Sequence, residues 1–161
     1  MIVVVMGVSG AGKTAVGSAL AEKLGWRFLD ADDHHPEANV ARMASGVPLE
    51  DADRWPWLER LNALLREAEA GGESAVLACS ALKQAYRDRL ADGLTHCEFV
   101  FLNGSFELIH GRLASRRHRF MSPSLLQSQF AALEPPARAI EVDAAAEVGH
   151  CVESICARLG A

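Results

Sequence analysis

The sequence lacks the features that mark membrane-spanning, secreted and nucleic-acid-binding proteins. Its 161 residues contain no apolar segment of about 20 residues, and no basic leader or cleavage site precedes the first apolar run. The four cysteines show neither CxxC nor zinc-site spacing, so we expect reduced thiols. The net charge of −5 argues against a polynucleotide partner. These absences predict a cytoplasmic protein that binds neither membrane nor nucleic acid.

The composition is that of an ordinary globular domain. Half of the residues are hydrophobic and 23% are charged, which excludes disordered and fibrous classes. The length, without repeats or low-complexity linkers, predicts one domain over residues 1–161. Basic residues do gather locally, at a density that suits one polyphosphate rather than a duplex, in Arg112, Arg116, Arg117 and Arg119.

Apolar runs alternate with helix-periodic stretches along the chain, which predicts a parallel sheet wrapped by helices. The predicted strands are Ile2–Met6, Trp26–Leu29, Ala75–Cys79, Glu98–Leu102 and Ala139–Val142. The predicted helices are Lys13–Leu24, Glu37–Ala44, Trp55–Ala70, Ala81–Ala91, Phe106–Arg116, Ser124–Leu133 and Ala146–Leu159. Two segments do not fit the simple alternation of strands and helices. We expect residues 30–70 to be an acceptor-binding insert and residues 116–133 to be a mobile lid.

The stretch GVSGAGKT follows the first strand and matches the phosphate-binding motif G-x-x-x-x-G-K-[ST] at every fixed position. Glycines let the backbone N–H groups turn around phosphate oxygens at the start of a helix. Lys13 is predicted to reach the β- and γ-phosphates, and the Thr14 hydroxyl to bind Mg²⁺. A glycine turn that only connects strand to helix would not need this Lys-Thr pair. The predicted nucleotide-binding residues are Gly7, Val8, Ser9, Gly10, Ala11, Gly12, Lys13 and Thr14.

The acid that accompanies Mg²⁺ in many P-loop proteins is missing from its usual strand, which ends in Cys79-Ser80. The guanine-specific NKxD motif is also absent. Asp30 and Asp32, after the second strand, are the alternative source of carboxylates. One is predicted to bind Mg²⁺ through water and the other to accept the proton of an acceptor hydroxyl. The competing interpretation is an acidic loop that caps the next helix.

Four further blocks resemble one family of small-molecule kinases. They are DADDHHP, RMASGVPLEDADRWPWL, CSALKQAYRDRL and FMSPSLLQSQFAALEPP, at residues 30–36, 42–58, 79–90 and 120–136. In this order, and with the P-loop, they resemble the gluconokinases, relatives of shikimate and nucleoside monophosphate kinases. The resemblance implies a three-layer α/β P-loop kinase fold with a five-stranded parallel sheet, flanking helices and a mobile lid. It also implies that MgATP phosphorylates D-gluconate to 6-phospho-D-gluconate.

The resemblance also assigns roles on the acceptor side. Asp32 is the expected base at the 6-hydroxyl, and Asp30 the expected Mg²⁺ contact through water. His35 is expected to contact the acceptor, the alternative being a loop histidine hydrogen-bonded to backbone. The charge that binds a sugar acid is expected from Arg54, Lys83 and Arg87. For the last two, which are four residues apart, the alternative is a solvated helix face paired with Asp88 or Glu98.

In the lid, Arg112 is expected to stack on adenine and Arg116 to contact the transferring phosphate, the alternative being a charge cluster at a helix end. The chain departs from the family pattern here. Where Arg-x-Gly-His-Phe is usual, residues 116–120 read RRHRF, and Ala52 interrupts the usual run of three aspartates. These departures concern lid motion and acceptor preference. Dimers are common in the family, so a homodimer is a further expectation.

Overall fold

A five-stranded parallel sheet forms the centre of the molecule. The computed structural model describes residues 1–116 and 122–161. The strands are β1 (Ile2–Met6), β2 (Arg27–Asp30), β3 (Ala75–Ala78), β4 (Cys97–Asn103) and β5 (Ile140–Asp143), in the order β2-β3-β1-β4-β5. Every pairing is parallel. The predicted sheet is therefore confirmed, and the strand ends differ from the prediction by no more than one residue.

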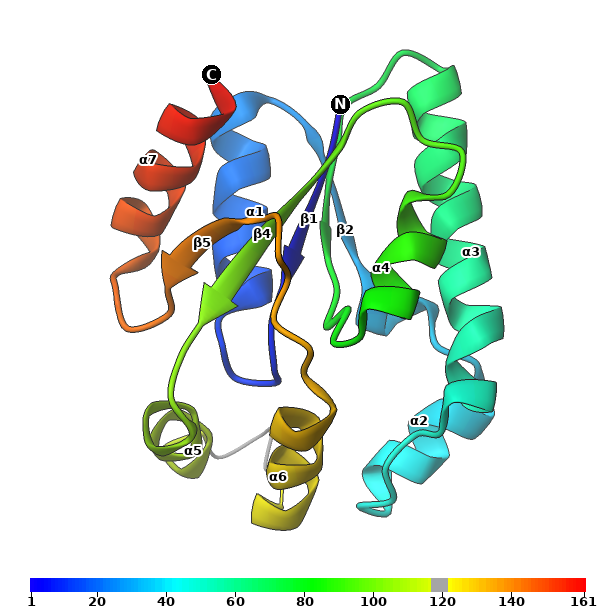
Figure 1. Ribbon diagram of the computed structural model, residues 1–161, viewed down its shortest axis with the longest axis vertical. Coiled ribbons are helices and arrows are strands. Elements are labelled where there is room, and N and C mark those ends of the chain that lie inside the picture. Colours follow the sequence, from blue (N-terminus) through cyan, green and yellow to red (C-terminus); the bar gives the residue numbers. More distant parts are fainter. Residues whose placement is uncertain (117–121) are drawn as a thin grey trace.

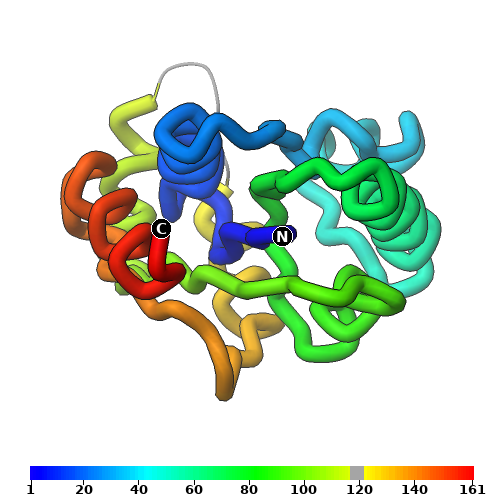
Figure 2. The backbone as a smooth tube through the Cα atoms, turned by 90° about the horizontal axis from the view of Figure 1, so that it is seen from above, coloured from blue at the N-terminus to red at the C-terminus, as the bar shows by residue number. Residues whose placement is uncertain are grey.

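Helices cover both faces of the sheet, as Figure 1 and Figure 2 show. On one face lie α1 (Lys13–Leu24) and α7 (Val148–Leu159), and on the other α3 (Asp51–Ala70) and α4 (Gln84–Ala91). Because side chains alternate along a strand, Val3 and Val5 of β1 pack on the first pair of helices, whereas Ile2, Val4 and Met6 pack on the second. All five are fully buried, which explains the uninterrupted apolar run at the start of the chain.

The remaining helices gather at the carboxyl ends of the strands, at the bottom of Figure 1, opposite both termini. They are the 3₁₀-helix η1 (Ala31–His34) and the helices α2 (Glu37–Ala44), α5 (Phe106–Ala114) and α6 (Pro123–Ala132). In open α/β sheets the ligand site lies at this edge, because the loops that follow neighbouring strands meet there. Among the described residues, no helix is both long enough and apolar enough to cross a membrane.

Four of the predicted helices begin at other residues: α6 begins one residue early, α7 two residues late, and α3 and α4 differ by more, for reasons that concern their first turns. Helix α3 begins at Asp51, four residues early, because the Asp53 carboxylate accepts a hydrogen bond from the Glu50 N–H (2.8 Å) in a capping box. Helix α4 begins at Gln84, three residues late, because Ala81 has φ 44°, which a right-handed helix cannot contain. Lys83 is therefore the residue that precedes α4, and the predicted shared helix face of Lys83 and Arg87 is wrong.

Candidate active site

The P-loop joins β1 to α1 at the carboxyl edge of the sheet. Gly12 precedes the helix with φ 100°, a conformation that side chains with a Cβ rarely adopt, and the space beside its Cα is open. Gly7 has no room for a side chain, since a Cβ there would lie 3.0 Å from the Leu102 carbonyl oxygen. The loop thus exposes backbone N–H groups at a helix N-terminus, the arrangement that binds phosphate.

Lys13 lies over this loop, and its Nζ donates to the Val8 carbonyl oxygen at 2.9 Å. Burial lowers the pKa of Lys13, and the carboxylates of Asp32 and Asp30 oppose that effect. The two aspartates therefore share an electrostatic environment with the P-loop lysine. This places the end of β2 beside the phosphate loop, as the sequence predicted.

Asp30 and Asp32 have different surroundings. Asp30 is tied in place, because one carboxylate oxygen accepts from Thr14 Oγ1 (2.8 Å) and the other from the Asp32 N–H (3.0 Å). The Asp32 side chain is 75% exposed and makes no hydrogen bond to another described residue. One carboxylate is thus joined to the P-loop threonine and the other is free to face a substrate.

Thr14 and Asp30 together offer oxygen atoms that suit Mg²⁺. Magnesium prefers hard oxygen ligands and usually binds through one or two protein groups, with water and phosphate completing its shell. A hydroxyl hydrogen-bonded to a carboxylate fits that preference. In residues 1–116 and 122–161 no three His, Cys, Asp or Glu residues gather as a metal-binding group.

His35 is fixed against Trp57 of α3. Its ring stacks on Trp57 with centroids 4.0 Å apart, and its side chain is 3% exposed. Nδ1 lies 3.3 Å from Nδ2 of Asn39, and Nε2 lies 3.9 Å from an Asp32 carboxylate oxygen. Burial lowers the pKa of His35, with Asp32 opposing that effect. The partner of the ring is thus a side-chain amide rather than the backbone group considered in the alternative.

A second polar group, the Tyr86 cluster, consists of Asp51, Arg54, Lys83 and Tyr86. Asp51 accepts hydrogen bonds from Lys83 Nζ (3.2 Å) and from the Tyr86 hydroxyl. The Arg54 guanidinium lies 5.4 Å from the centre of the Tyr86 ring, and Lys83 Nζ lies 5.7 Å from it. The hydrogen bonds from Tyr86 and Lys83 lower the pKa of Asp51.

The sequence predicted only two of the four residues of the Tyr86 cluster as site residues. Arg54 and Lys83 were predicted, and Lys83 pairs with Asp51 rather than with Asp88 or Glu98. Asp51 and Tyr86 were not predicted as site residues. The available signal was that both belong to the blocks that resemble the gluconokinases, but 35 residues separate them in the chain.

Arg87 does not join this cluster. It is 3% exposed, and its guanidinium donates to the carbonyl oxygens of Ala81 (2.8 Å), Leu82 (3.2 Å) and Glu134 (2.8 Å). The Gln84 side chain accepts from its remaining N–H groups. Through these hydrogen bonds Arg87 connects the β3–α4 loop with the segment after α6. Its predicted contact with the acceptor stays a prediction.

We expect Arg87→Ala to destabilise the protein by about 3 kcal/mol, because several buried carbonyl oxygens lose their donors. Denaturant unfolding should show a lower midpoint with an unchanged slope. The matched control is Arg89→Ala, which removes only surface ion pairs to Glu59 and Asp92 and should cost less than about 1 kcal/mol. Unchanged stability of Arg87→Ala together with a raised KM for the acceptor would instead place Arg87 in the acceptor site.

Two described contacts involve α5, which precedes the predicted lid, and α6, which lies within it. Arg112 of α5 donates to the carbonyl oxygen of Ala144, in the loop after β5. On α6, the Gln129 side-chain oxygen accepts from the Ser9 N–H of the P-loop at 2.7 Å, a contact that the sequence analysis missed. Arg116 is exposed just after α5 ends. Its predicted role, like the stacking of Arg112 on adenine, stays a prediction, and the altered positions 117–120 lie outside the described residues.

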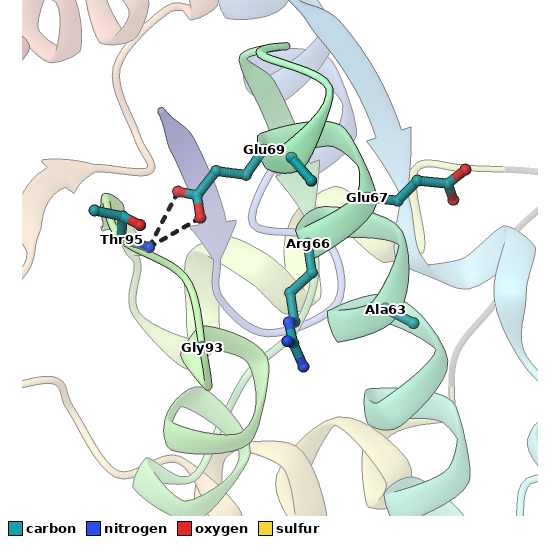
Figure 3. A pocket seen from close by; sticks show the side chains of 7 residues that line it. Ala63, Arg66, Glu67, Glu69, Gly93 and Thr95 are labelled. Atoms are coloured by element: carbon teal, nitrogen blue, oxygen red, sulfur yellow. Dashed lines mark hydrogen bonds between the residues drawn. The ribbon is translucent and has the colours of Figure 1, made fainter.

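Two surface pockets lie away from Lys13 and Asp32. One, of about 580 Å³, is formed by the C-terminal part of α3 and the turn before β4, at the amino end of that strand (Figure 3). There the Glu69 carboxylate accepts from the N–H groups of Thr95 and His96, which stabilises the turn. The other, of about 820 Å³, adjoins the carboxyl ends of β4 and β5 and includes Asn103, Asp143 and Ala145. Only the second lies at the edge of the sheet that carries the P-loop.

A P-loop, a threonine–aspartate pair and a free carboxylate at the carboxyl edge of a parallel sheet define a P-loop kinase. In agreement, residues 9–134 match the family model described as shikimate kinase. A probable gluconokinase of Rattus norvegicus is 53% identical over 84% of this chain and 83% of its own length. The gluconokinase of Gluconobacter oxydans (strain 621H) is 50% identical over 83% of this chain and 75% of its own length.

A solved structure agrees with these relatives. The gluconokinase of Sinorhizobium meliloti 1021 superimposes with a TM-score of 0.87 at 43% identity, covering 98% of this chain and 90% of that one. The chain therefore belongs to the gluconokinase family and is a kinase. The family resemblance, the α/β fold and the enzyme class expected from the sequence are confirmed.

Proposed function

We propose that this kinase transfers the γ-phosphoryl group of ATP to D-gluconate, giving ADP and 6-phospho-D-gluconate. The names of the relatives support this substrate. The structural observation that carries it is the Tyr86 cluster, in which Lys83 pairs with the Asp51 carboxylate, while Arg54 donates only to the Leu49 carbonyl oxygen and the Tyr86 hydroxyl. One positive charge is left over for an anionic acceptor such as a sugar acid.

The donor side follows from the P-loop. Residues 7–14 would hold the phosphates of ATP, Arg112 the adenine, and Lys13 and Arg116 the charge of the transferring group. Thr14 would hold Mg²⁺ directly and Asp30 through water, as their hydrogen bond allows. When bound, Mg²⁺ would neutralise negative charge on the β- and γ-phosphates.

The acceptor side follows from β2, β3 and the insert between them. Asp32 would accept the proton of the 6-hydroxyl, and its exposed carboxylate is consistent with that role. His35, Arg54 and Lys83 would bind the other oxygens of the sugar acid. Arg87 would hold the β3–α4 loop that ends in Lys83, and its own contact with the acceptor remains part of the proposal.

Other expectations from the sequence remain part of the proposal. We propose that residues 1–161 act as one kinase domain, with residues 30–70 as the acceptor insert and 116–133 as a mobile lid. A cytoplasmic location fits a soluble metabolite as the substrate, and homodimer formation stays a prediction that the molecular mass in solution would test.

The test is ADP release from MgATP with D-gluconate, shikimate, a nucleoside monophosphate or no acceptor. We expect release with D-gluconate alone. Release with another acceptor would keep the kinase but contradict the pocket assignment. ATP binding without release under any condition would instead indicate a nucleotide-dependent binding module.

A further inference from the structure

A buried asparagine in α2 lies beside the ring of His35. Asn39 is only 4% exposed, and its Nδ2 donates to the Asp53 carbonyl oxygen at 2.9 Å. The same nitrogen lies 3.3 Å from His35 Nδ1. One amide thus connects the loop after η1 with the first turn of α3.

The carbonyl oxygen of Asp53 determines the chemistry of this contact. A carbonyl can only accept, so the Asn39 atom that faces it must be the amide nitrogen, which carries two hydrogens. One hydrogen is donated to Asp53, and the other points to His35 Nδ1. Nδ1 must therefore accept, and in a neutral ring the proton then resides on Nε2. Burial lowers the pKa of His35, which favours the neutral ring.

The ring is also fixed in position. It stacks on Trp57, whose indole N–H donates to the Ala31 carbonyl oxygen at 2.8 Å. Nε2 therefore stays 3.9 Å from the Asp32 oxygen, too far for a direct hydrogen bond. An oxygen atom between them could lie about 2.8 Å from each and so form a hydrogen bond with both. A hydroxyl at this place could donate its proton to Asp32 while it accepts from Nε2–H.

We propose that Asn39 is a positioning residue that holds His35 as the Nε2–H tautomer, so that the ring donates to an acceptor hydroxyl that also reaches Asp32. The proposal rests on the proposed function for the identity of the acceptor, but the tautomer does not depend on it. The charged groups that face the ring are Asp32, beside Nε2, and Arg54, whose charge opposes protonation.

The tautomer can be measured directly in the full chain. Long-range ¹H–¹⁵N spectra of ¹⁵N-histidine-labelled protein distinguish Nδ1–H from Nε2–H, and His35→Gln identifies the His35 signals among the six histidines. We expect Nε2–H in the wild type. Asn39→Asp replaces the donor with an acceptor and should place a proton on Nδ1. A wild-type Nδ1–H tautomer, or an unchanged ring in Asn39→Asp, would overturn the proposal.

The chain offers a matched control in Asn62, which is also 4% exposed and donates to two backbone carbonyl oxygens, those of Leu90 and Asp92. Asn62→Asp should disturb folding to a similar degree and leave the His35 signals as in the wild type. If Asn62→Asp changes the tautomer as much as Asn39→Asp does, the effect is a general one of destabilisation, and the proposal is wrong.

A kinetic cycle tests the consequence for the acceptor and remains informative if Asn39→Asp does not fold. We expect Asn39→Ala to raise KM for D-gluconate about tenfold and to leave KM for ATP unchanged. Glutamine at position 35 keeps an amide donor near the place of Nε2 whatever residue is at position 39. In His35→Gln, the same Asn39→Ala change should therefore alter KM by less than about twofold. Equal effects in both backgrounds would overturn the proposal.

These measurements separate the two proposals. If the wild type does not phosphorylate D-gluconate, the proposed function fails, and the spectra still decide whether Asn39 sets the tautomer. If the wild type does phosphorylate it but the cycle shows no coupling, the inference fails and the proposed function stands.

Discussion

Lys13→Ala is expected to lower kcat/KM by at least about 100-fold, which corresponds to several kcal/mol of transition-state stabilisation. The Lys13 ammonium lies on the P-loop and donates to the Val8 carbonyl oxygen, so little movement would bring it to a bound γ-phosphate. Its loss removes positive charge from the place where negative charge develops, in a partly buried site where charge is poorly screened.

The measurement is steady-state ADP release with D-gluconate at varied ATP. Lys23→Ala is a suitable control because Lys23 is an exposed lysine in the last turn of the same helix, and this variant should match the wild type. Turnover near the wild-type rate in Lys13→Ala would remove the P-loop lysine from the mechanism.

Asp32→Asn is expected to bind ATP with wild-type affinity and to lose phosphoryl transfer, by about 10²- to 10⁴-fold in kcat. The amide is almost the same size as the carboxylate, but it cannot accept the hydroxyl proton as a base. Because the Asp32 side chain is 75% exposed and does not support the fold through its carboxylate, stability should be unaffected.

Two neighbouring variants make this result specific. Asp33→Asn changes an adjacent exposed carboxylate and should keep wild-type turnover. Asp30→Asn weakens the hydrogen bond from Thr14 and should raise the Mg²⁺ concentration that activity requires. A titration of ATP binding, followed by single-turnover transfer, separates these effects. Wild-type transfer by Asp32→Asn would mean that another residue is the base.

The contrast between the two aspartates illustrates how far spacing alone can be interpreted. Alternation along a strand predicts that side chains two residues apart share a face. Here Asp30 ends β2 while Asp32 already belongs to η1, and the carboxylate of Asp30 caps that short helix. The chain turns between the two residues, so spacing could suggest that their roles differ, whereas the assignment of Asp30 to the Mg²⁺ beside Thr14 came from the family resemblance.

The fold and the P-loop could be predicted from the sequence because they depend on residues that are close together in the chain. The buried strand, the glycine loop and the helix Lys13–Leu24 are continuous in sequence, and the structure has the first and last of them with the predicted ends. Backbone requirements of this kind depend on residues that are neighbours in the chain, such as Gly12 and Gly25 at the two ends of α1. The P-loop kinase class could therefore be identified from the residues and their order.

The contacts of Tyr86 and Arg87 depended on tertiary structure because they join distant parts of the chain. Tyr86 reaches Asp51 across 35 residues, and Arg87 reaches Glu134 across 47. Whether an arginine binds a substrate or braces a loop depends on which carbonyl groups folding brings to it, and its own sequence neighbours do not determine that. The sequence by itself determined the fold class, the phosphate loop and the charged residues from which a site can be built. Only the tertiary structure decided that Lys83 belongs with Asp51 and Tyr86, that Arg87 donates to the Glu134 carbonyl oxygen, and that Asn39 faces His35.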